Sequence, residues 1–512
     1  MFALSACTAI PGARYPREVS HAVARPADGF SHTLANESAR PNESGFRMLS
    51  VGLDGLAARL EMIDRAESAL DLQYYIFRAD ASGDLVAHAL LRAADRGVRI
   101  RILVDDGESV AGDEKLFALA AHPMIQMRVF NPFDYRGHRH VIRAVDFLLH
   151  KRRLDHRMHN KLMVADNALA LIGGRNIGNQ YFQIDPESQF GDDDVIAYGP
   201  IIQQLSDVYD LFWNSAEAIP IKALEPRHAS QQALEAWRSQ PIETQKLDQF
   251  QAELDKRLKK GEPLAGVLSV HDPLTWATAE LVYDSPDKAS ADNNNDGHSR
   301  REIYPGIAAR AERARRELLM ITPYFVPSEA ELSMLQGERA RNVRVAILTN
   351  SLEAAPDVVA HAGYTHYRKS LLGEGVEVHE MRASPEGAHT GQSKRISRFG
   401  NYGLHAKLYI FDRQSLFVGS MNFDQRSKHL NTEIGLIVDS PQMAESAAQR
   451  FEGLVALKNS YTVTLSDSDK GGLLWKTERD GRIVEYSREP ARGEWQRFEA
   501  RTVSLLPLDK EL

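Results

Sequence analysis

The sequence predicts an α/β protein with two duplicated domains, each a mixed β-sheet flanked by helices, related by a pseudo-twofold axis. Three observations indicate this fold class. Helical and strand patterns alternate along most of the chain. The stretch RGVRIRIL at residues 96–103 recurs as RNVRVAIL at residues 341–348, and a motif around His159 recurs around His405 at nearly the same separation. An internal duplication explains both repeats.

The composition is that of a globular protein with more than one domain. The chain has 512 residues, of which 43% are hydrophobic and 26% charged. Its net charge of -8 argues against a dedicated nucleic-acid binder, so we expect no nucleic-acid partner. A single cysteine excludes an internal disulfide. No apolar run is long enough for a transmembrane helix, and none is expected.

Residues 1–46 are rich in Pro, Ala, Arg, Ser and Asn without periodicity, which is typical of a flexible N-terminal lead-in. Within them, LSAC at residues 4–7 has the shape of a bacterial lipoprotein processing site, so Cys7 is a candidate for lipidation. The basic and apolar regions that usually precede such a site are nearly absent. An ordinary cysteine in a flexible terminus is the alternative.

The first domain, residues 47–221, opens with a helical pattern from Gly52, in which Leu53, Leu56, Leu60 and Ile63 form an apolar stripe. Residues 70–77 indicate a buried strand. A helix over residues 84–96 and a strand over residues 97–104 follow.

The stretch from Met158 to Asn176 is the expected functional centre of this domain. Side chains two residues apart in a strand share a face, so His159 and Lys161 should point to the same side. A nucleophile or proton carrier beside a fixed cation is half of a site for phosphate chemistry. Asp166 ends this strand, and a glycine-rich turn leads to Asn176.

The second domain, residues 276–464, repeats the series with strands expected at 318–326 and 341–348. Its motif residues stand at the same offsets as those of the first domain: His405, Lys407, Asp412 and Asn422. Residues 222–275 between the domains have helical spacing and read as a helical linker. Residues 465–512 read as a C-terminal appendage with a short hairpin.

Paired His-x-Lys-x4-Asp motifs followed by Gly-x-x-Asn, in a duplicated α/β chain, resemble the phospholipase D superfamily. The resemblance extends from about Gly52 to Thr464. GGRNIG at 173–178, DDDV at 192–195 and LLPL at 505–508 look most like bacterial cardiolipin synthases of the C type. The superfamily also contains hydrolases, nucleases and phosphatidylserine synthases, so the motif alone does not identify the substrate.

The resemblance implies a covalent phosphohistidine intermediate. It assigns His159 as nucleophile and His405 as general acid and then general base. The halves are pseudo-symmetric, so the reverse assignment stays open. Lys161 and Lys407 would contact the non-bridging phosphate oxygens and lower the cost of attack.

Six further polar residues belong to the expected site. Asn176 and Asn422 follow the glycine turns and could donate hydrogen bonds to the phosphate. Asp192 and Glu433 each stand at the same distance before a proline, and we expect them to orient the imidazoles. A solvated loop charge is the alternative for both. Asp166 and Asp412 are counted with the catalytic motif, although a turn-forming aspartate that bonds nearby backbone is the preferred interpretation.

No metal or other cofactor is expected, because the two lysines supply the charge that a metal would. A divalent cation is the competing interpretation, since two groups offer suitable ligands: Asp155, His156 and His159, and Asp192, Asp193 and Asp194. The second motif has no equivalent of the first group.

The expected activity is phosphatidyl transfer to phosphatidylglycerol, which gives cardiolipin, with phosphatidylethanolamine as another candidate donor. A phospholipase D hydrolase that releases phosphatidic acid is the main alternative, followed by a metal-independent nuclease and by a membrane scaffold with an inactive site. Basic residues precede both motifs and favour peripheral contact with an anionic membrane, although solvated loops would look the same. They are Arg136, Arg139, Arg143, Lys151, Arg152, Arg153 and Arg157, and Lys394, Arg395 and Arg398. The expected location is the bacterial cell envelope, peripheral or lipid-anchored.

Overall fold

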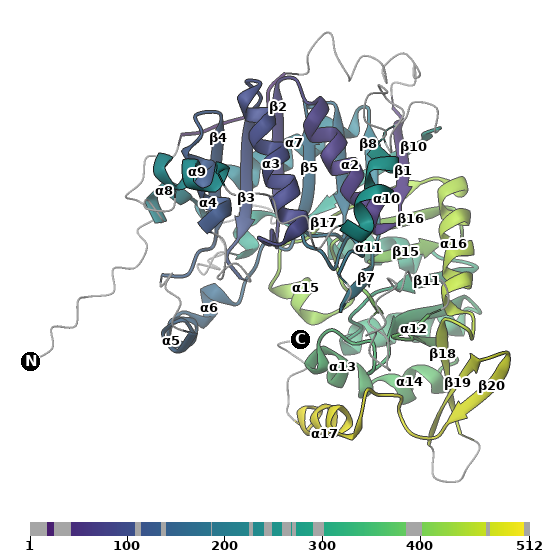
Figure 1. Ribbon diagram of the computed structural model, residues 1–512. Coiled ribbons are helices and arrows are strands. Elements are labelled where there is room, and N and C mark those ends of the chain that lie inside the picture. The colour runs from purple at the N-terminus through teal and green to yellow at the C-terminus, as the bar shows by residue number, and fades with distance from the viewer. Residues whose placement is uncertain are drawn as a thin grey trace, which may run out of the picture.

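Two α/β halves form one molecule in the computed structural model (Figure 1). The first half occupies the upper part of the picture and the second half the lower part. The residues that the structure describes are 18–24, 42–107, 114–134, 140–185, 187–224, 229–239, 248–258, 268, 273–289, 302–385, 402–466 and 472–505.

The first half contains a mixed sheet whose central strands β2, β3 and β4 are parallel. Strand β5 runs antiparallel to β2, and β6, β8 and β1 continue the sheet antiparallel. In spatial order the strands are β9 (Ala218–Pro220), β4 (Ile125–Phe130), β3 (Arg99–Asp105), β2 (Ala69–Tyr74), β5 (Lys161–Ala165), β6 (Leu169–Gly173), β8 (Asp194–Tyr198) and β1 (Ser44–Leu49).

The second half repeats this topology. Parallel strands β11, β12 and β13 correspond to β2, β3 and β4, and antiparallel β15, β16 and β17 correspond to β5, β6 and β8. In spatial order the strands are β20 (Arg482–Tyr486), β19 (Leu473–Arg479), β18 (Ser460–Leu465), β13 (Glu377–Met381), β12 (Arg344–Asn350), β11 (Glu317–Ile321), β15 (Leu408–Phe411), β16 (Ser415–Gly419) and β17 (Ile434–Asp439). The predicted duplicated α/β fold is confirmed.

One long strand joins the two sheets. Strand β10 (Thr275–Tyr283) pairs through its first residues with β1 and through its remaining residues with β17. The two sheets are therefore one continuous hydrogen-bonded structure in the described part of the chain.

The repeated sequence around residues 96 and 341 is a helix ending. Helix α3 (Ala81–Asp95) ends where Gly97 adopts a φ of 95°, and helix α12 (Glu329–Ala340) ends where Asn342 adopts a φ of 61°. Glycine and asparagine accept this left-handed conformation most readily. In each copy the following valine donates its N–H back to the helix, and a parallel strand begins directly afterwards.

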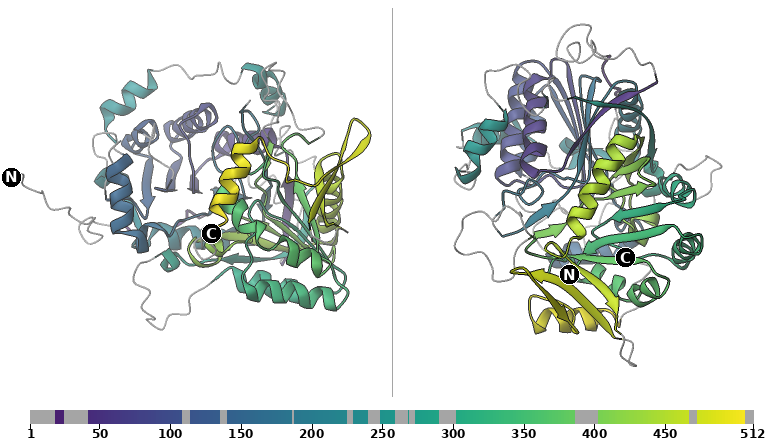
Figure 2. Two further views of the ribbon diagram at one scale, coloured as in Figure 1. Left: turned by 90° about the horizontal axis from the view of Figure 1, so that it is seen from below. Right: turned by 90° about the vertical axis from the view of Figure 1, so that its right-hand side faces the viewer.

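The helices cover both faces of each sheet (Figure 2). Helix α2 (Gly52–Arg65) and α3 pack on the outer face of the first sheet, and α11 (Tyr304–Glu312), α12 and α14 (Arg368–Gly373) pack on that of the second. Helices α7 (Ile201–Trp213) and α16 (Pro441–Val455) bury their apolar sides in a central core with the inner faces of both sheets. Because this core contains side chains from both halves, the halves are held together by apolar burial.

The linker and the C-terminal region pack on opposite halves. Helices α9 (Gln231–Arg238) and α10 (Asp248–Leu258) contribute Leu234, Trp237 and Leu254 to the core of the first half. Strands β19 and β20 form a hairpin that extends the second sheet, and α17 (Glu494–Val503) lies against α13 (Val358–Thr365). The remaining helices are α4 (Glu114–Ala118), α5 (His140–Leu149), α6 (Lys151–Leu154), α8 (Ile221–Leu224) and α15 (Gln425–His429).

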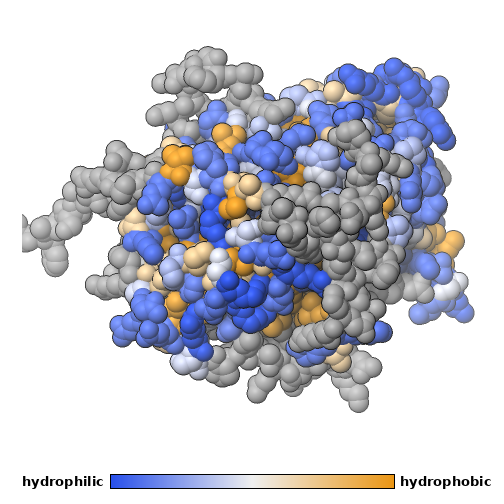
Figure 3. Space-filling view, turned by 90° about the horizontal axis from the view of Figure 1, so that it is seen from above, coloured by the Kyte–Doolittle hydropathy of each residue, from blue (hydrophilic) through white to orange (hydrophobic). Residues whose placement is uncertain are grey.

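Seen from above, the surface of the first half is mainly hydrophilic, with small separated apolar spots (Figure 3). Among the helices that the structure describes, none is long and apolar enough to cross a bilayer.

Candidate active site

The two motif segments meet between the halves, at the carboxyl ends of the parallel strands. Lys161 begins β5 opposite Tyr74, the last residue of β2. In the second half Leu408 begins β15 opposite Ile321, the last residue of β11. Each histidine therefore lies just beyond the carboxyl edge of its own sheet, where loops converge in open α/β folds.

Each histidine is positioned by backbone of the other half. The short strands β14 (Tyr402–Leu404) and β7 (Gln189–Gly191) run parallel across the boundary, and the His405 N–H donates to the Gly191 carbonyl at 2.7 Å. In the other direction Met158 bridges to Thr432, and the His159 N–H donates to the Thr432 carbonyl at 2.9 Å. These two crossings bring both imidazoles into one centre.

The crossings also exchange the carboxylates. His159 Nδ1 lies 2.9 and 3.0 Å from the two carboxylate oxygens of Glu433, and His405 Nδ1 lies 2.6 Å from Asp192 Oδ2. The spacing in the sequence does not say which carboxylate serves which imidazole, and the structure pairs each with the imidazole of the other half. An Nδ1–H donated to a carboxylate leaves the Nε2 lone pair available for chemistry.

A glycine allows Asp192 to approach the backbone closely. A Cβ at Gly174 would lie 2.1 Å from Asp192 Oδ1, so no side chain fits there. The glycine-rich turn after the first motif thus has a steric reason.

Both lysines lie buried beside the imidazoles. Lys161 Nζ donates to the His159 carbonyl at 2.6 Å. Lys407 Nζ donates to the His405 carbonyl and lies 3.0 Å from His405 Nδ1. Two ammonium groups and two imidazoles therefore share one water-poor space.

Burial and like charge lower the pKa values of these four groups. Burial lowers the pKa of Lys407 to about 8 and that of Lys161 well below its usual value. Burial together with the Lys407 charge lowers the pKa of His405 to about 3. Burial, Lys161 and Lys407 also hold the pKa of His159 well below its usual value. The free site therefore contains two neutral imidazoles near pH 7.

The pKa values of the two carboxylates, Asp192 and Glu433, are shifted in opposite directions. Burial alone would raise the pKa of Asp192, but His405 and Lys407 outweigh it and hold that pKa below its usual value. Burial raises the pKa of Glu433 to about 7, and Lys161 and a hydrogen bond from Ser420 oppose it only in part. Near neutral pH the Asp192 carboxylate is fully ionised, whereas Glu433 is partly protonated.

The two motif asparagines are buried and have unused hydrogen-bonding capacity in the described part of the chain. Asn176 Oδ1 accepts from the Ile76 N–H at 3.1 Å, and its buried Nδ2 has no partner among the described residues. Asn422 likewise keeps its buried Oδ1 without one in the described part of the chain. A buried donor without a partner is costly, so an acceptor in a ligand would satisfy Asn176.

Aromatic side chains of the first half flank the imidazoles. Tyr75 meets His159 edge-on with ring centroids 5.1 Å apart, and Lys161 Nζ lies 5.4 Å from the Tyr75 ring centroid. Tyr181 and Phe190 lie 5.1 and 5.3 Å from the His405 ring. Sequence reasoning missed these residues, because none belongs to the repeated motif and aromatic residues in strands and turns usually indicate packing.

Asp166 and Asp412 do not lie at this centre. Each follows the far end of the strand that begins beside the motif lysine, in a left-handed conformation with φ of 53° and 55°. Asp166 accepts three consecutive backbone N–H groups, from Glu67 to Ala69, and Asp412 accepts those of residues 315–317. Their contacts fasten the chain before β2 and β11, so we propose that both have a structural role in place of the catalytic one expected from the motif. The backbone that they bind is also distant in sequence, unlike that of a local turn.

Three of the four acidic residues considered as metal ligands are paired with arginines, and the fourth, Asp192, is paired with His405. Asp194 pairs with Arg59 and Arg175, Asp193 with Arg450, and Asp155 with Arg426. These ion pairs connect elements of the fold around the site.

Only some of the basic residues that precede the first motif lie on the surface. Arg157 is buried and pairs with Asp105, and Arg153 pairs with Asp134, so both point into the structure. Arg152 is exposed. Arg136, Arg139, Lys394, Arg395, Arg398 and Cys7 lie outside the described residues, as does the Arg143 side chain.

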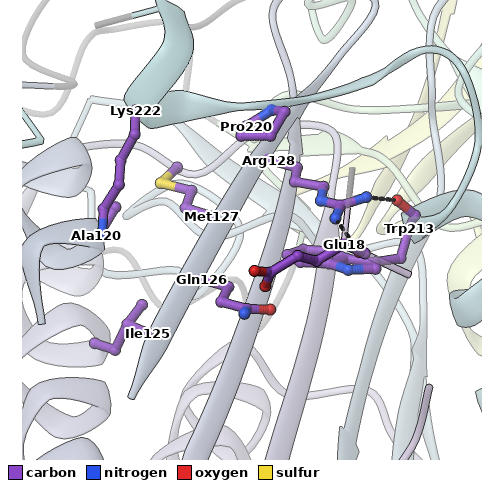
Figure 4. Close-up of a pocket in the computed structure, with 9 residues that line it drawn as sticks. All are labelled: Glu18, Ala120, Ile125, Gln126, Met127, Arg128, Trp213, Pro220 and Lys222. Atoms are coloured by element: carbon purple, nitrogen blue, oxygen red, sulfur yellow. Dashed lines mark hydrogen bonds between the residues drawn. The ribbon is translucent and has the colours of Figure 1, made fainter. Parts of the chain in front are cut away.

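A separate cavity of about 320 Å³ lies at the β4 edge of the first sheet (Figure 4). Arg128 crosses it and donates to the backbone carbonyls of Trp213 and Glu18. None of the predicted site residues that the structure describes lines this cavity.

Comparison with known proteins points to one family. Residues 60–213 and 307–455 match the family described as cardiolipin synthase, PLD-like domain. Cardiolipin synthase C of Escherichia coli K12 is 34% identical over 477 residues, which cover 92% of this chain and 97% of that protein. Cardiolipin synthase A of Yersinia pestis bv. Antiqua is 24% identical over 412 residues, which cover 80% and 69%. The crystal structure of phosphatidylserine synthase from Haemophilus influenzae Rd KW20 has the same fold, with a TM-score of 0.57, 12% identity and coverage of 94% and 99%.

Proposed function

The chain belongs to the cardiolipin synthase family with phospholipase D-like domains, and we propose that it transfers a phosphatidyl group to a hydroxyl of phosphatidylglycerol. The product is cardiolipin, and the donor headgroup is released. The observation that carries the proposal is one buried centre with two carboxylate-oriented imidazoles and two ammonium groups. Such a centre matches the anionic phosphodiester shared by all phospholipid donors.

In the first half-reaction His159 is the nucleophile. Its Nε2 forms a bond to phosphorus as the bond from phosphorus to the headgroup oxygen breaks. His405 donates a proton to that oxygen. Lys161, Lys407 and Asn176 stabilise the charge on the non-bridging oxygens.

In the second half-reaction His405 accepts the proton of a phosphatidylglycerol hydroxyl. The alcohol oxygen attacks phosphorus and displaces His159. This step returns His159 to the neutral imidazole and leaves His405 protonated, as at the start. A water molecule in place of the alcohol would give phosphatidic acid, so the competing hydrolase differs only in the acceptor.

The unequal carboxylates support this division of roles. Ionised Asp192 stabilises the imidazolium of His405, which a general acid requires. Partly protonated Glu433 stabilises an imidazolium less well, which leaves His159 as a neutral nucleophile. The phosphodiester anion offsets the charge of the two lysines on binding, and this raises the pKa of His405 toward the range in which it carries a proton.

Phosphatidylglycerol is the acceptor in this proposal, and phosphatidylglycerol or phosphatidylethanolamine is the donor. The protein acts peripherally on a membrane of the bacterial envelope, and lipidation of Cys7 would add an anchor. No metal ion or other cofactor takes part in the proposed steps.

The test uses purified protein with vesicles that contain labelled phosphatidylglycerol. Cardiolipin should form, and His159→Ala should abolish its formation. His156→Ala is the matched control and should leave activity intact, because the His156 ring contacts the carbonyl of the exposed Arg152, four residues earlier. Formation of phosphatidic acid without cardiolipin would replace the transferase with a hydrolase.

A further inference from the structure

Helix α17 presents its largest apolar side chains to solvent. Its inner face against the second half consists of smaller or polar side chains: Gln496, Arg497, Ala500, Val503 and Ser504. Gln496 donates to the Leu352 carbonyl and Arg497 to the Glu489 carbonyl. Trp495 and Phe498 point outward with exposed fractions of 76% and 59%, and Leu505, just after the helix, is 83% exposed. This arrangement is the reverse of an ordinary surface helix.

A second helix, on the first half, also presents apolar side chains to solvent. In α5 the outward side chains are Val145, Leu148 and Leu149, and the two leucines are 71% and 73% exposed. The exposed Arg152 lies one turn further on. On α17 the exposed Arg501 lies beside the apolar stripe. Each apolar stripe thus has a cation at its margin.

Each helix is connected to a motif histidine, α5 along the chain and α17 through a series of contacts. Helix α6 and a short segment lead from α5 directly to His159. Helix α17 lies on Leu352, and Arg492 just before it donates to the Glu353 carbonyl. The next carbonyl, that of Ala354, lies 3.0 Å from the position of a Cβ on Gly403, two residues before His405.

The two helices also lie on one side of the molecule. Both are in the lower half of Figure 1, α5 at the left and α17 at the bottom. Seen from below, α17 lies in front of the second half and α5 at the margin of the first (Figure 2). The face seen from above is mainly hydrophilic (Figure 3).

We infer that α5 and α17 form a two-point docking surface for an anionic phospholipid bilayer. This inference rests on the proposed function, since that substrate lies in a membrane. Two separated convex stripes, one on each half, fit a planar lipid surface better than the concave face of one protein partner. Tryptophan and phenylalanine enter the interfacial layer readily, and arginine beside them meets anionic headgroups. The docked orientation brings the boundary between the halves toward the membrane.

The test is flotation of the full chain with vesicles of phosphatidylethanolamine and phosphatidylglycerol. The paired variants W495S with F498S, and L148S with L149S, should each weaken binding roughly tenfold or more, because each removes two large apolar side chains. Leu211→Ser on α7 is the control, since Leu211 is a 43% exposed leucine on another helix. Cardiolipin formation in detergent micelles should stay unchanged in every variant, which also shows that the variants fold.

A second measurement detects contact between Trp495 and the bilayer directly, without a variant that binds more weakly. Vesicles with brominated acyl chains should quench the tryptophan fluorescence of the unaltered protein, and Trp495→Phe should remove most of that quenching. Unchanged flotation and unchanged quenching in the variants would overturn the docking surface, whatever the activity. If the paired variants bound vesicles fully but no longer formed cardiolipin in cells, the docking surface would also be overturned, and a protein partner would replace the bilayer. Lost binding in the variants, with no cardiolipin from any preparation, would support docking and refute the proposed transferase.

Discussion

At the scale of single residues, each motif imidazole depends on a carboxylate from the other half. Replacing Asp192 with Asn removes the acceptor of the His405 Nδ1–H, and replacing Glu433 with Gln does the same for His159. We expect each variant to lose roughly 10²- to 10⁴-fold in the rate of cardiolipin formation, because the wrong tautomer is then favoured. The loss should appear mainly in kcat.

Nitrogen NMR of labelled histidine distinguishes the crossed pairing from a pairing within each half. Asp192→Asn should shift the His405 resonances and leave those of His159, and Glu433→Gln should do the reverse. The opposite pattern would show that each carboxylate serves the histidine of its own half.

The lysines predict an alkaline limit to activity. Burial lowers the pKa of Lys407 to about 8 in the free enzyme, so its charge is present below pH 8 and is lost as the pH rises through that value. We therefore expect kcat/KM to fall above about pH 8, well below the range in which an ordinary lysine titrates. The profile of kcat should fall later, because a bound phosphodiester favours the ammonium form. A kcat/KM that stays flat beyond pH 9.5 would contradict a charged Lys407 in the reaction.

The repeated motif predicted the residues that meet at the centre, but not their neighbours. His159, Lys161, Asn176 and their counterparts share offsets, and duplication makes such offsets visible in a single sequence. No such repeat marks the neighbouring side chains, because the two halves differ at these positions. They are Ser420, Tyr75, Tyr181 and Phe190. The difference between Asp192 and Glu433 also depends on burial and neighbouring charges, which sequence spacing does not contain.

At the scale of elements, Asp166 fastens the backbone before β2 to the end of β5. Its carboxylate accepts three main-chain N–H groups and the Ser68 hydroxyl. Asp166→Ala should therefore lower the free energy of unfolding by about 2–4 kcal/mol, since buried donors lose a charged acceptor. Activity per folded molecule should change little, because the residue lies at the far end of the strand from Lys161.

Urea unfolding followed by circular dichroism measures this loss. Asp207→Ala on α7 is a suitable control, because its exposed carboxylate accepts a hydrogen bond from the exposed Gln203 side chain of the same helix. A stable but inactive Asp166→Ala protein would return Asp166 to the reaction itself.

Apolar periodicity in the sequence predicted the long helices and strands but not the shortest strands. Residues 84–96 predict most of helix α3, and residues 97–104 most of strand β3. Strands β7 and β14 have three residues each, too few to show a period. They exist because each pairs with the other across the boundary, so they depend on the assembled fold rather than on local sequence.

At the scale of the whole molecule, the two halves form one structural and chemical unit. The central core combines Leu162 and Ile172 of the first sheet with Leu408 and Val418 of the second. Strand β10 hydrogen-bonds to both sheets. A displacement of one half would therefore disturb the apolar core and both crossed histidine–carboxylate pairs together.

A single shared centre predicts strongly non-additive histidine variants. His159→Ala removes the proposed nucleophile and His405→Ala the proposed acid and base, and neither half-reaction proceeds without both. The double variant should therefore be no more than about tenfold slower than either single variant, as for residues that act as one unit. Rates of cardiolipin formation, with urea unfolding to exclude loss of structure, measure the three variants. Losses that multiply would mean two independent sites, and the crossed pairing of His159 with Glu433 and of His405 with Asp192 would then have no common function.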